Sequence, residues 1–258
     1  MPQLQRLAIT APQICDRKID LTREQQHYLN RVLRLHAGDR FIAMDGRGHW
    51  WLAVLEARET GLFASIAEEI AVNRELPVEV TLMAALPKGN GFDEVVRQAT
   101  ELGVASIVPV TSDRTLLKPS DQKVDRWRRI AAEAAEQSER QFVPTILDPI
   151  SFEFALKDSA QKSRYICVAR GENRHLWDCL IGSFDPPFVG AVSPCPPPAW
   201  GELSIVIAVG PEGGWTEGEV KRAIEFNFEA VSLGSRILRA VTAPIVALSL
   251  VGAAFEKC

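Results

Sequence analysis

The sequence has no long apolar stretch. No run in its 258 residues reaches the roughly 18 to 20 consecutive apolar residues that a membrane-spanning helix needs. The opening MPQLQRLAIT also has no apolar core followed by a small-residue cleavage site. The longest apolar segment, residues 243–255, contains Ser249 and Gly252 and is typical of a buried helix. We therefore expect a protein without a membrane span or an export signal.

Cysteine and histidine are also scarce. The five cysteines are odd in number and none forms a Cys-x-x-Cys pair, which argues against a disulfide framework and a zinc ribbon. His175 and Cys179 stand four residues apart and could supply two metal ligands, but a hydrolytic metal centre needs a third and none stands nearby. We expect no metal, and a location in the reducing cytoplasm.

Neither sign of charge dominates. The 29 lysines and arginines face 33 aspartates and glutamates, a formal net charge of −4, which argues against indiscriminate binding to nucleic acid. The first 50 residues differ, because eight basic side chains there stand against five acidic ones. The N-terminal end is therefore better suited to contacts with phosphate.

Two hydrophobic patterns divide the chain. Short apolar runs separated by turn formers in residues 40–70 predict a small antiparallel sheet or barrel, and residues 22–35 show a helical face that starts at a Thr22 cap. From residue 78 onward, wholly apolar runs alternate with helical periodicity, as in parallel sheets buried on both faces. We expect an α/β second domain, a boundary in residues 73–77, and a surface excursion in the proline-rich residues 186–198. Strands are expected at 78–86, 105–110, 165–169, 204–209 and 230–233, and helices at 92–102, 121–141 and from 244 onward.

The most informative segment follows the apolar strand at 204–209. It continues into Gly210-Pro-Glu-Gly-Gly214, after which Thr216 and Glu219 form a capping box that opens a helix. Three glycines without a Cβ let main-chain groups approach a ligand closely. The turn matches neither a Gly-x-Gly-x-x-Gly fingerprint nor a P-loop, and an ordinary strand-to-helix turn is the competing interpretation.

A second glycine-bearing loop follows the next buried strand. Residues 233–239 read Leu-Gly-Ser-Arg-Ile-Leu-Arg and lead into a helix whose first turn holds Pro244. Loops after neighbouring parallel strands face each other across one crevice, which is the usual ligand site of open α/β sheets. Arg236 and Arg239 lie in this loop, either as ligand contacts or as solvated or ion-paired side chains.

Together these motifs resemble a known family. Gly210 to Gly214, Leu233-Gly-x-Arg-Ile-Leu-Arg239 and Thr242-Ala243 are similar to the C-terminal signature of the SPOUT-class RNA methyltransferases, and more narrowly to the bacterial RsmE family. Similar blocks stand at Leu86-Pro-Lys-Gly89, Ala99-Thr-Glu-Leu-Gly-Val104, residues 131–140 and His27-Tyr-Leu-x-Arg-Val-Leu-Arg-Leu35. The likeness covers nearly the whole chain except residues 186–200.

The resemblance implies a fold and an activity. It implies a PUA-like, RNA-binding β-barrel in residues 1–73 and a SPOUT methyltransferase domain in residues 74–258, with a largely parallel sheet and a trefoil knot. It also implies S-adenosylmethionine as cofactor and methylation of N3 of a specific uridine in 16S ribosomal RNA of the small ribosomal subunit. A homodimer is implied too, with the last helix at its interface, although that helix would equally fit an intramolecular core.

Site residues follow by matching motifs. A guanidinium would stabilise the negative charge that develops on the uracil ring, and the candidates are Arg236, Arg239 and, from the partner subunit, Arg114 or Arg140. The implied cofactor pocket comprises Gly210, Pro211, Glu212, Gly213, Gly214, Leu233, Gly234, Ile237, Leu238, Arg239, Thr242 and Ala243. The candidate RNA contacts are Arg6, Arg17, Arg31, Arg34, Arg47 and Lys88.

The chain departs from the family pattern at one notable position. Val241 stands where many relatives carry a glutamate, which argues against any mechanism here that needs that acid. Two other functions stay open, a SPOUT methyltransferase that acts on a different RNA and a non-catalytic RNA-binding protein. The second would keep the basic N-terminal residues but would not need the paired glycine loops.

Overall fold

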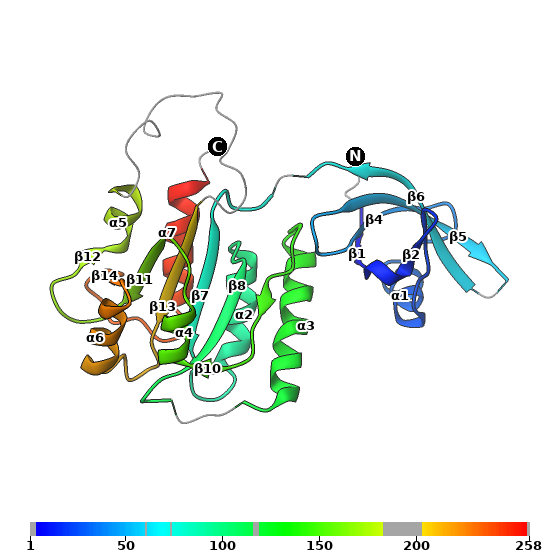
Figure 1. Ribbon diagram of the computed structural model, residues 1–258. Coiled ribbons are helices and arrows are strands. Elements are labelled where there is room, and N and C mark those ends of the chain that lie inside the picture. The colour runs from blue at the N-terminus through cyan, green and yellow to red at the C-terminus, as the bar shows by residue number, and fades with distance from the viewer. Residues whose placement is uncertain (1–3, 60, 73, 116–118, 183–202, 257–258) are drawn as a thin grey trace. The chain divides into compact units, whose positions relative to one another are not determined.

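Figure 1 shows the computed structural model of the chain, which describes residues 4–59, 61–72, 74–115, 119–182 and 203–256. The chain forms two compact units. The first comprises Met1–Glu75 and Ala135–Val143, and the second comprises Leu76–Ala134 and Pro144–Cys258. The proline-rich excursion expected at residues 186–198 lies outside the described residues. Within the described ranges, no helix has the length and apolar character needed to cross a membrane.

The first unit is built on a six-stranded sheet. Its strand order is β1-β4-β5-β6-β3-β2, with β1 parallel to β4 and the other pairs antiparallel. The strands are β1 (Arg6–Ala8), β2 (Ile14–Cys15), β3 (Lys18–Ile19), β4 (Arg40–Met44), β5 (Trp50–Arg58) and β6 (Gly61–Ile70). The helical segments are the 3₁₀ turn η1 (Ala11–Gln13), α1 (Arg23–His27) and the π-helical turn η2 (Tyr28–Val32). The antiparallel sheet predicted for residues 40–70 is confirmed.

Thr22 caps α1 as predicted. Its hydroxyl accepts a hydrogen bond from the Gln25 N–H at 3.2 Å, and Gln25 Oε1 accepts one from the Thr22 N–H at 2.9 Å, which completes a capping box. The helix is shorter than the pattern of residues 22–35 predicts, because the chain changes to π-helical geometry at Tyr28. Leu29 remains buried and joins a core with Ile19, Phe41 and Leu55.

A segment from the middle of the chain completes the first unit. Within residues 135–143, the Gln141 carbonyl accepts a hydrogen bond from the Gly48 N–H and the Val143 N–H donates one to the Gly46 carbonyl, both at 3.0 Å. A Cβ on Gly46 would come within 2.6 Å of Val143 Cγ2, and Gly46 has a φ of +65°. Only glycine fits at this turn.

The second unit is an α/β sandwich around a parallel sheet. The strand order is β10-β8-β7-β13-β11-β14-β12, β9 pairs with β8, and all of these pairs are parallel. The strands are β7 (Glu79–Ala85), β8 (Ser106–Thr111), β9 (Thr145–Ile146), β10 (Ile150–Ser151), β11 (Ser163–Cys167), β12 (Arg174–His175), β13 (Ser204–Val209) and β14 (Glu229–Ser232). The helices are α2 (Gly91–Glu101), α4 (Phe152–Asp158), α5 (Leu176–Gly182), α6 (Glu217–Glu225) and α7 (Ala243–Phe255), together with α3 (Asp121–Gln137), whose last turn belongs to the first unit.

Helices cover both faces of this sheet. Helices α2 and α5 contact α7 on one face, whereas α4 contacts α6 on the other (Figure 1). The apolar side chains of α4 and α6 pack on the sheet in one core that includes Phe152, Leu156, Ala223, Val206 and Ile166. The largely parallel α/β domain expected from the sequence is therefore confirmed, while the trefoil knot stays a prediction.

Candidate functional site

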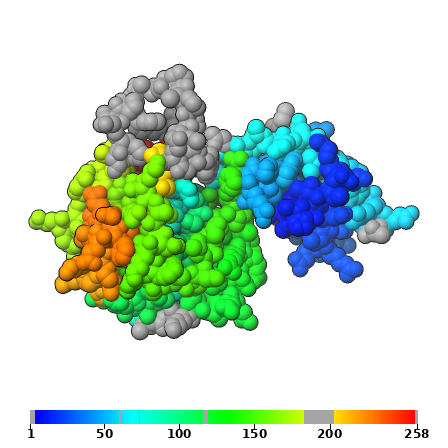
Figure 2. Space-filling model, viewed as in Figure 1, coloured from blue at the N-terminus to red at the C-terminus, as the bar shows by residue number. Residues whose placement is uncertain are grey.

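The second unit contains a pocket of about 990 Å³ at the carboxyl ends of its central strands. Its walls come from the segments that follow β11, β13 and β14 and from one face of α6, whose atoms are orange in Figure 2. Because these strands are parallel, their carboxyl ends lie at the same edge of the sheet. The two glycine loops singled out in the sequence thus line one pocket.

The loop after β13 forms a tight main-chain wall. Gly214 has a φ of +69°, and its N–H donates to the Pro211 carbonyl at 2.8 Å. A Cβ on Gly210 would lie 3.2 Å from the Trp215 indole, which stacks on Phe152 at 4.1 Å. Gly210 therefore lets the indole pack close to the main chain.

The loop after β14 supplies a second wall. Gly234 has a φ of +109°, and no atom lies within 4 Å of the position where its Cβ would be. Six further residues of this region line the pocket, namely Leu233, Arg236, Ile237, Leu238, Ala240 and Ala243. Arg239 and Thr242 are not among the lining residues. The Arg239 carbonyl instead accepts hydrogen bonds from the Thr242 and Ala243 N–H groups, both at 2.9 Å, where α7 begins.

A third wall was missed by the sequence reasoning. It comprises residues 167–171, which begin with the last residue of β11 and end at Gly171 with a φ of +99°. The signal was present, because a glycine shortly after a buried strand also marks the other two loops. Burial raises the pKa of the Cys167 thiol to about 12, so this lining residue is a neutral thiol at physiological pH.

Arg114 lies at the pocket of its own chain. It follows β8, lines the pocket, and donates from Nη1 to the carbonyl of Gly213. The sequence suggests Arg114 as a contribution from a partner subunit. The structure instead brings it to the glycine loop of the same chain.

Arg140 is placed differently from the other candidate arginines. Its side chain is 5% exposed and forms an ion pair with Glu75, which is 1% exposed, with 2.5 Å between Nη2 and Oε2. The same carboxylate accepts hydrogen bonds from the Gln141 and Phe142 N–H groups at 2.8 and 3.1 Å. This ion pair holds the guanidinium inside the first unit and favours a structural role for Arg140, while its suggested role at a reacting base of the partner subunit stays a prediction.

The candidate RNA contacts separate into two groups. Arg31, Arg34, Arg47 and Lys88 are exposed. Arg6 pairs with Glu139 at 2.8 Å, and Arg17, although exposed too, donates to the Ile66 and Ala67 carbonyls at 3.0 and 2.8 Å. The second group is therefore engaged within the first unit. Lys88 also links its loop to the pocket wall, because its N–H donates to Glu212 Oε1 at 2.9 Å.

The part of the chain that the structure describes holds no group of three or more histidine, cysteine, aspartate or glutamate side chains able to bind a metal ion. His175 and Cys179, the two candidate metal ligands, have other contacts. Cys179 donates to Glu229 Oε1 at 3.3 Å, and His175 Nδ1 accepts from the Trp177 N–H at 3.2 Å. Burial also raises the pKa of the Cys179 thiol to about 11.

Comparison with known families defines the class. A family model described as an RNA methyltransferase domain matches residues 74–252, and one described as an RNA methyltransferase PUA domain matches residues 21–66. These are the pocket-bearing part of the chain and the part that holds β4, β5 and most of β6.

Individual relatives define the particular family. The chain is 44% identical over 254 residues to ribosomal RNA small subunit methyltransferase E of Synechocystis sp., covering 98% of this chain and 78% of the relative. For the Bacillus subtilis protein of the same name, identity is 34%, with 90% and 88% covered. A crystal structure of this methyltransferase from Neisseria gonorrhoeae bound to S-adenosyl methionine superposes with a TM-score of 0.81 at 30% identity, covering 98% of each chain. The chain belongs to the family of ribosomal RNA small subunit methyltransferase E.

Proposed function

We propose that the protein transfers a methyl group from S-adenosylmethionine to N3 of one uridine in the 16S ribosomal RNA of the small ribosomal subunit. One observation carries the proposal: two glycine loops that are separate in the sequence line a single pocket. The name shared by the relatives supports the RNA substrate, and the bound ligand of the Neisseria structure supports the cofactor.

The pocket residues fit this cofactor. Its volume lies at the upper end of the range of about 300–1,000 Å³ for small-molecule sites. Gly214 and Gly234 leave their α-carbons bare, so the main chain is open to polar contacts, while Val168, Ile237 and Leu238 offer an apolar surface to a flat ring. When bound, S-adenosylmethionine supplies an electrophilic methyl group.

The arginines of the site suit the acceptor. Loss of the N3 proton of uridine spreads negative charge over the ring and its two carbonyl oxygens, and a guanidinium stabilises that charge as it develops. Arg236 and Arg114 both line the pocket and are exposed. We assign the charge-stabilising role to Arg236, with Arg239 in the same loop as the alternative.

The first domain would hold the RNA. We propose that residues 1–73 bind RNA through Arg31, Arg34 and Arg47, and that residues 74–258 carry out the reaction with Lys88 beside the pocket. We further propose a cytoplasmic homodimer that uses α7. This helix is almost wholly apolar, yet Ile245, Val246 and Leu250 are only partly buried within the chain.

The decisive experiment is mass spectrometry of 16S RNA from cells that lack the protein. We expect the loss of one N3-methyluridine, restored by the wild-type gene and by purified protein with S-adenosylmethionine and small subunits. Loss of a methyl group from another RNA would favour the alternative substrate. If titration calorimetry detects no binding of S-adenosylmethionine, the protein is a non-catalytic RNA-binding protein.

The RNA-binding residues have a separate test. Replacing Arg31 and Arg34 with alanine should weaken RNA binding and reduce the slope of log K against log salt by about 1 for each phosphate that is no longer bound. Arg58→Ala is the matched control, because Arg58 already pairs with Asp20 at 2.8 Å. Equal slopes for the double variant and the control would remove these arginines from the RNA interface.

A further inference from the structure

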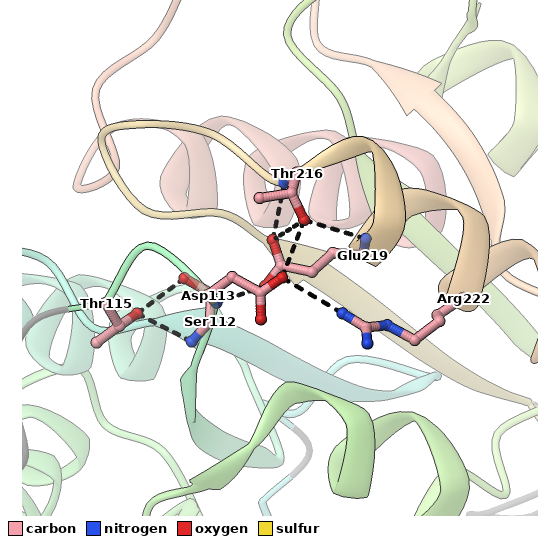
Figure 3. A network of polar contacts seen from close by, with 6 residues as sticks. All are labelled: Ser112, Asp113, Thr115, Thr216, Glu219 and Arg222. Atoms are coloured by element: carbon pink, nitrogen blue, oxygen red, sulfur yellow. Dashed lines mark hydrogen bonds and ion pairs between the residues drawn. The ribbon is translucent and has the colours of Figure 1, made fainter.

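A buried carboxylate connects two loops at the pocket. Glu219 is 1% exposed and lies in the first turn of α6, directly after the glycine loop. Its Oε2 atom accepts hydrogen bonds from the Thr216 N–H at 2.7 Å and the Thr216 hydroxyl at 3.0 Å, which completes the predicted capping box. Its Oε1 atom accepts one from the Asp113 N–H at 2.9 Å, across to the loop after β8 (Figure 3).

The loop that Glu219 reaches is a closed turn that carries Arg114. The Thr115 N–H donates to the Ser112 carbonyl at 3.0 Å, and the Ser112 N–H donates to the Thr115 hydroxyl at 2.9 Å. Asp113 and Arg114 are the two central residues of this turn. The Asp113 carboxylate makes a second connection between this turn and α6, because it lies 3.2 Å from the Thr216 hydroxyl and 3.4 Å from Arg222 Nη2 (Figure 3).

Arg114 connects the turn at residues 112–115 to the glycine loop. Its guanidinium donates to the Gly213 carbonyl, and a Cβ on Gly213 would lie 3.1 Å from Arg114 Cδ. Arg114 itself is exposed, so packing alone does not fix its position. The position of its guanidinium therefore depends on how firmly the turn at residues 112–115 is held against α6.

Two other capping boxes of the same chain show what a cap alone requires. At η1 and at α1, Gln13 and Gln25 accept from the Thr10 and Thr22 N–H groups, each at 2.9 Å. Their amide Nε2 groups donate to carbonyls, of Asp20 at 2.8 Å and of Ala8 at 2.9 Å. A glutamine is thus sufficient for the cap. In Glu219 the atom that corresponds to this amide nitrogen is Oε1, and it faces the Asp113 N–H donor. A carboxylate oxygen can accept that hydrogen bond, whereas an amide NH2 group cannot.

We propose that Glu219 is a positioning residue for methyl transfer, which acts by holding the turn of Asp113 and Arg114 at the pocket. This inference rests on the proposed function. Methyl transfer needs donor and acceptor in line, and misplacement of a group by about 1 Å can cost about 100-fold in rate. A link that fixes Arg114 to the glycine loop would therefore affect turnover more than folding.

The test is Glu219→Gln in the full-length protein. The glutamine can still cap α6, but its NH2 group would face either the Asp113 N–H or the Thr216 N–H. We expect kcat on small ribosomal subunits to fall at least about tenfold, with a smaller change in the Kd of S-adenosylmethionine. The effect should be non-additive with Arg114→Ala, because the two residues would act as one unit. Glu94→Gln, an exposed glutamate in the first turn of α2, is the charge-matched control and should leave kcat unchanged.

A structural readout separates this inference from the proposed function. Hydrogen exchange at the Asp113 amide should become faster in Glu219→Gln and stay at the wild-type rate in Glu94→Gln. If the glutamine variant does not fold, Asp113→Ala replaces it, since that side chain is 58% exposed; this variant should lower kcat a few-fold, and only when Arg114 is present.

Three results would overturn the inference: an unchanged kcat, additive losses in the Arg114→Ala background, or unchanged exchange at Asp113. If the wild-type protein methylates no RNA, the proposed function fails by itself, and the exchange measurement still decides whether Glu219 holds the turn.

Discussion

Val241 lies directly against the bare α-carbon of Gly91, so that a Cβ on Gly91 would come within 2.8 Å of Val241 Cγ1. Gly91 is the first residue of α2, and Val241 belongs to the segment that leads into α7. The Val241 side chain, which stands where the family resemblance suggested a glutamate, is therefore used for packing. Its contact fixes the start of one helix against the approach to another.

Gly91→Ala should destabilise the protein by about 1–3 kcal/mol, because an added methyl group overfills this contact. Val241→Ala in the same chain should restore much of that loss by making room for the new Cβ. Urea unfolding of the two single variants and the double variant measures the coupling. Additive effects would show that the two side chains do not compete for the same space.

Much of the second unit is predictable, because strand and helix periods differ and the strands are buried on both faces. The apolar run at residues 204–209 is β13 with the same bounds, and Gly103 has the φ of +86° expected after the end of α2. Helices α4 and α5 were not predicted. Each spans only seven residues, too few for a helical period to stand out from the neighbouring sequence.

The catalytic assignment predicts different outcomes for two neighbouring arginines. Arg236→Ala should lower the rate of methyl transfer by about 100-fold, in the range seen when one charge-stabilising donor is removed, with little change in cofactor affinity. Arg239→Ala should have a smaller effect on rate, because Arg239 does not line the pocket. Single-turnover rates at saturating cofactor measure both. A larger loss for Arg239→Ala would reverse the assignment.

The conformation of Gly214 predicts an effect on cofactor binding. Its φ of +69° is strained by about 1–2 kcal/mol for a residue with a Cβ, so Gly214→Ala should weaken S-adenosylmethionine about tenfold as the loop adjusts. Gly218→Ala is the matched control, since Gly218 lies in α6 with no atom closer than 4.0 Å to a Cβ. That variant should gain up to about 1 kcal/mol in stability and bind normally. Titration calorimetry compares the two, and equal affinities would mean that the loop tolerates the side chain.

The buried pair of Glu75 and Arg140 predicts a stability effect without a catalytic one. Replacing either residue with alanine should cost about 3–5 kcal/mol, because the remaining charge stays buried. Glu75→Ala should cost more, since the Gln141 and Phe142 N–H groups lose their acceptor as well. Arg74→Ala should cost about 1 kcal/mol or less, because Arg74 is 52% exposed and Glu139 keeps its ion pair with Arg6. Thermal unfolding ranks the three, and methylation by folded Arg140→Ala should proceed at the wild-type rate.

Site residues were predictable to the extent that their role depends on the local main chain. Glycine permits positive φ angles and proline fits the first turn of a helix, so the sequence itself indicates the local conformation of the glycine loops and of Pro244. The structure places both glycine loops at the carboxyl ends of strands. Arg140 shows the limit of this reasoning. Its ion-pair partner Glu75 lies 65 positions away in the sequence. A local sequence pattern does not reveal that so distant a residue neutralises the charge of a side chain.

The route of the chain through residues 135–143 has a consequence for biogenesis. Translation must proceed to residue 143 before the turn at Gly46 and Gly48 receives its covering segment, so the first unit cannot be finished as soon as residue 75 is made. For the same reason, a fragment that ends at residue 75 would lack residues 135–143 of the first unit. A fragment that starts at residue 76 would contain residues 135–143 without the rest of the first unit. The proposed RNA binding and methyl transfer are therefore better separated by point substitutions than by truncation.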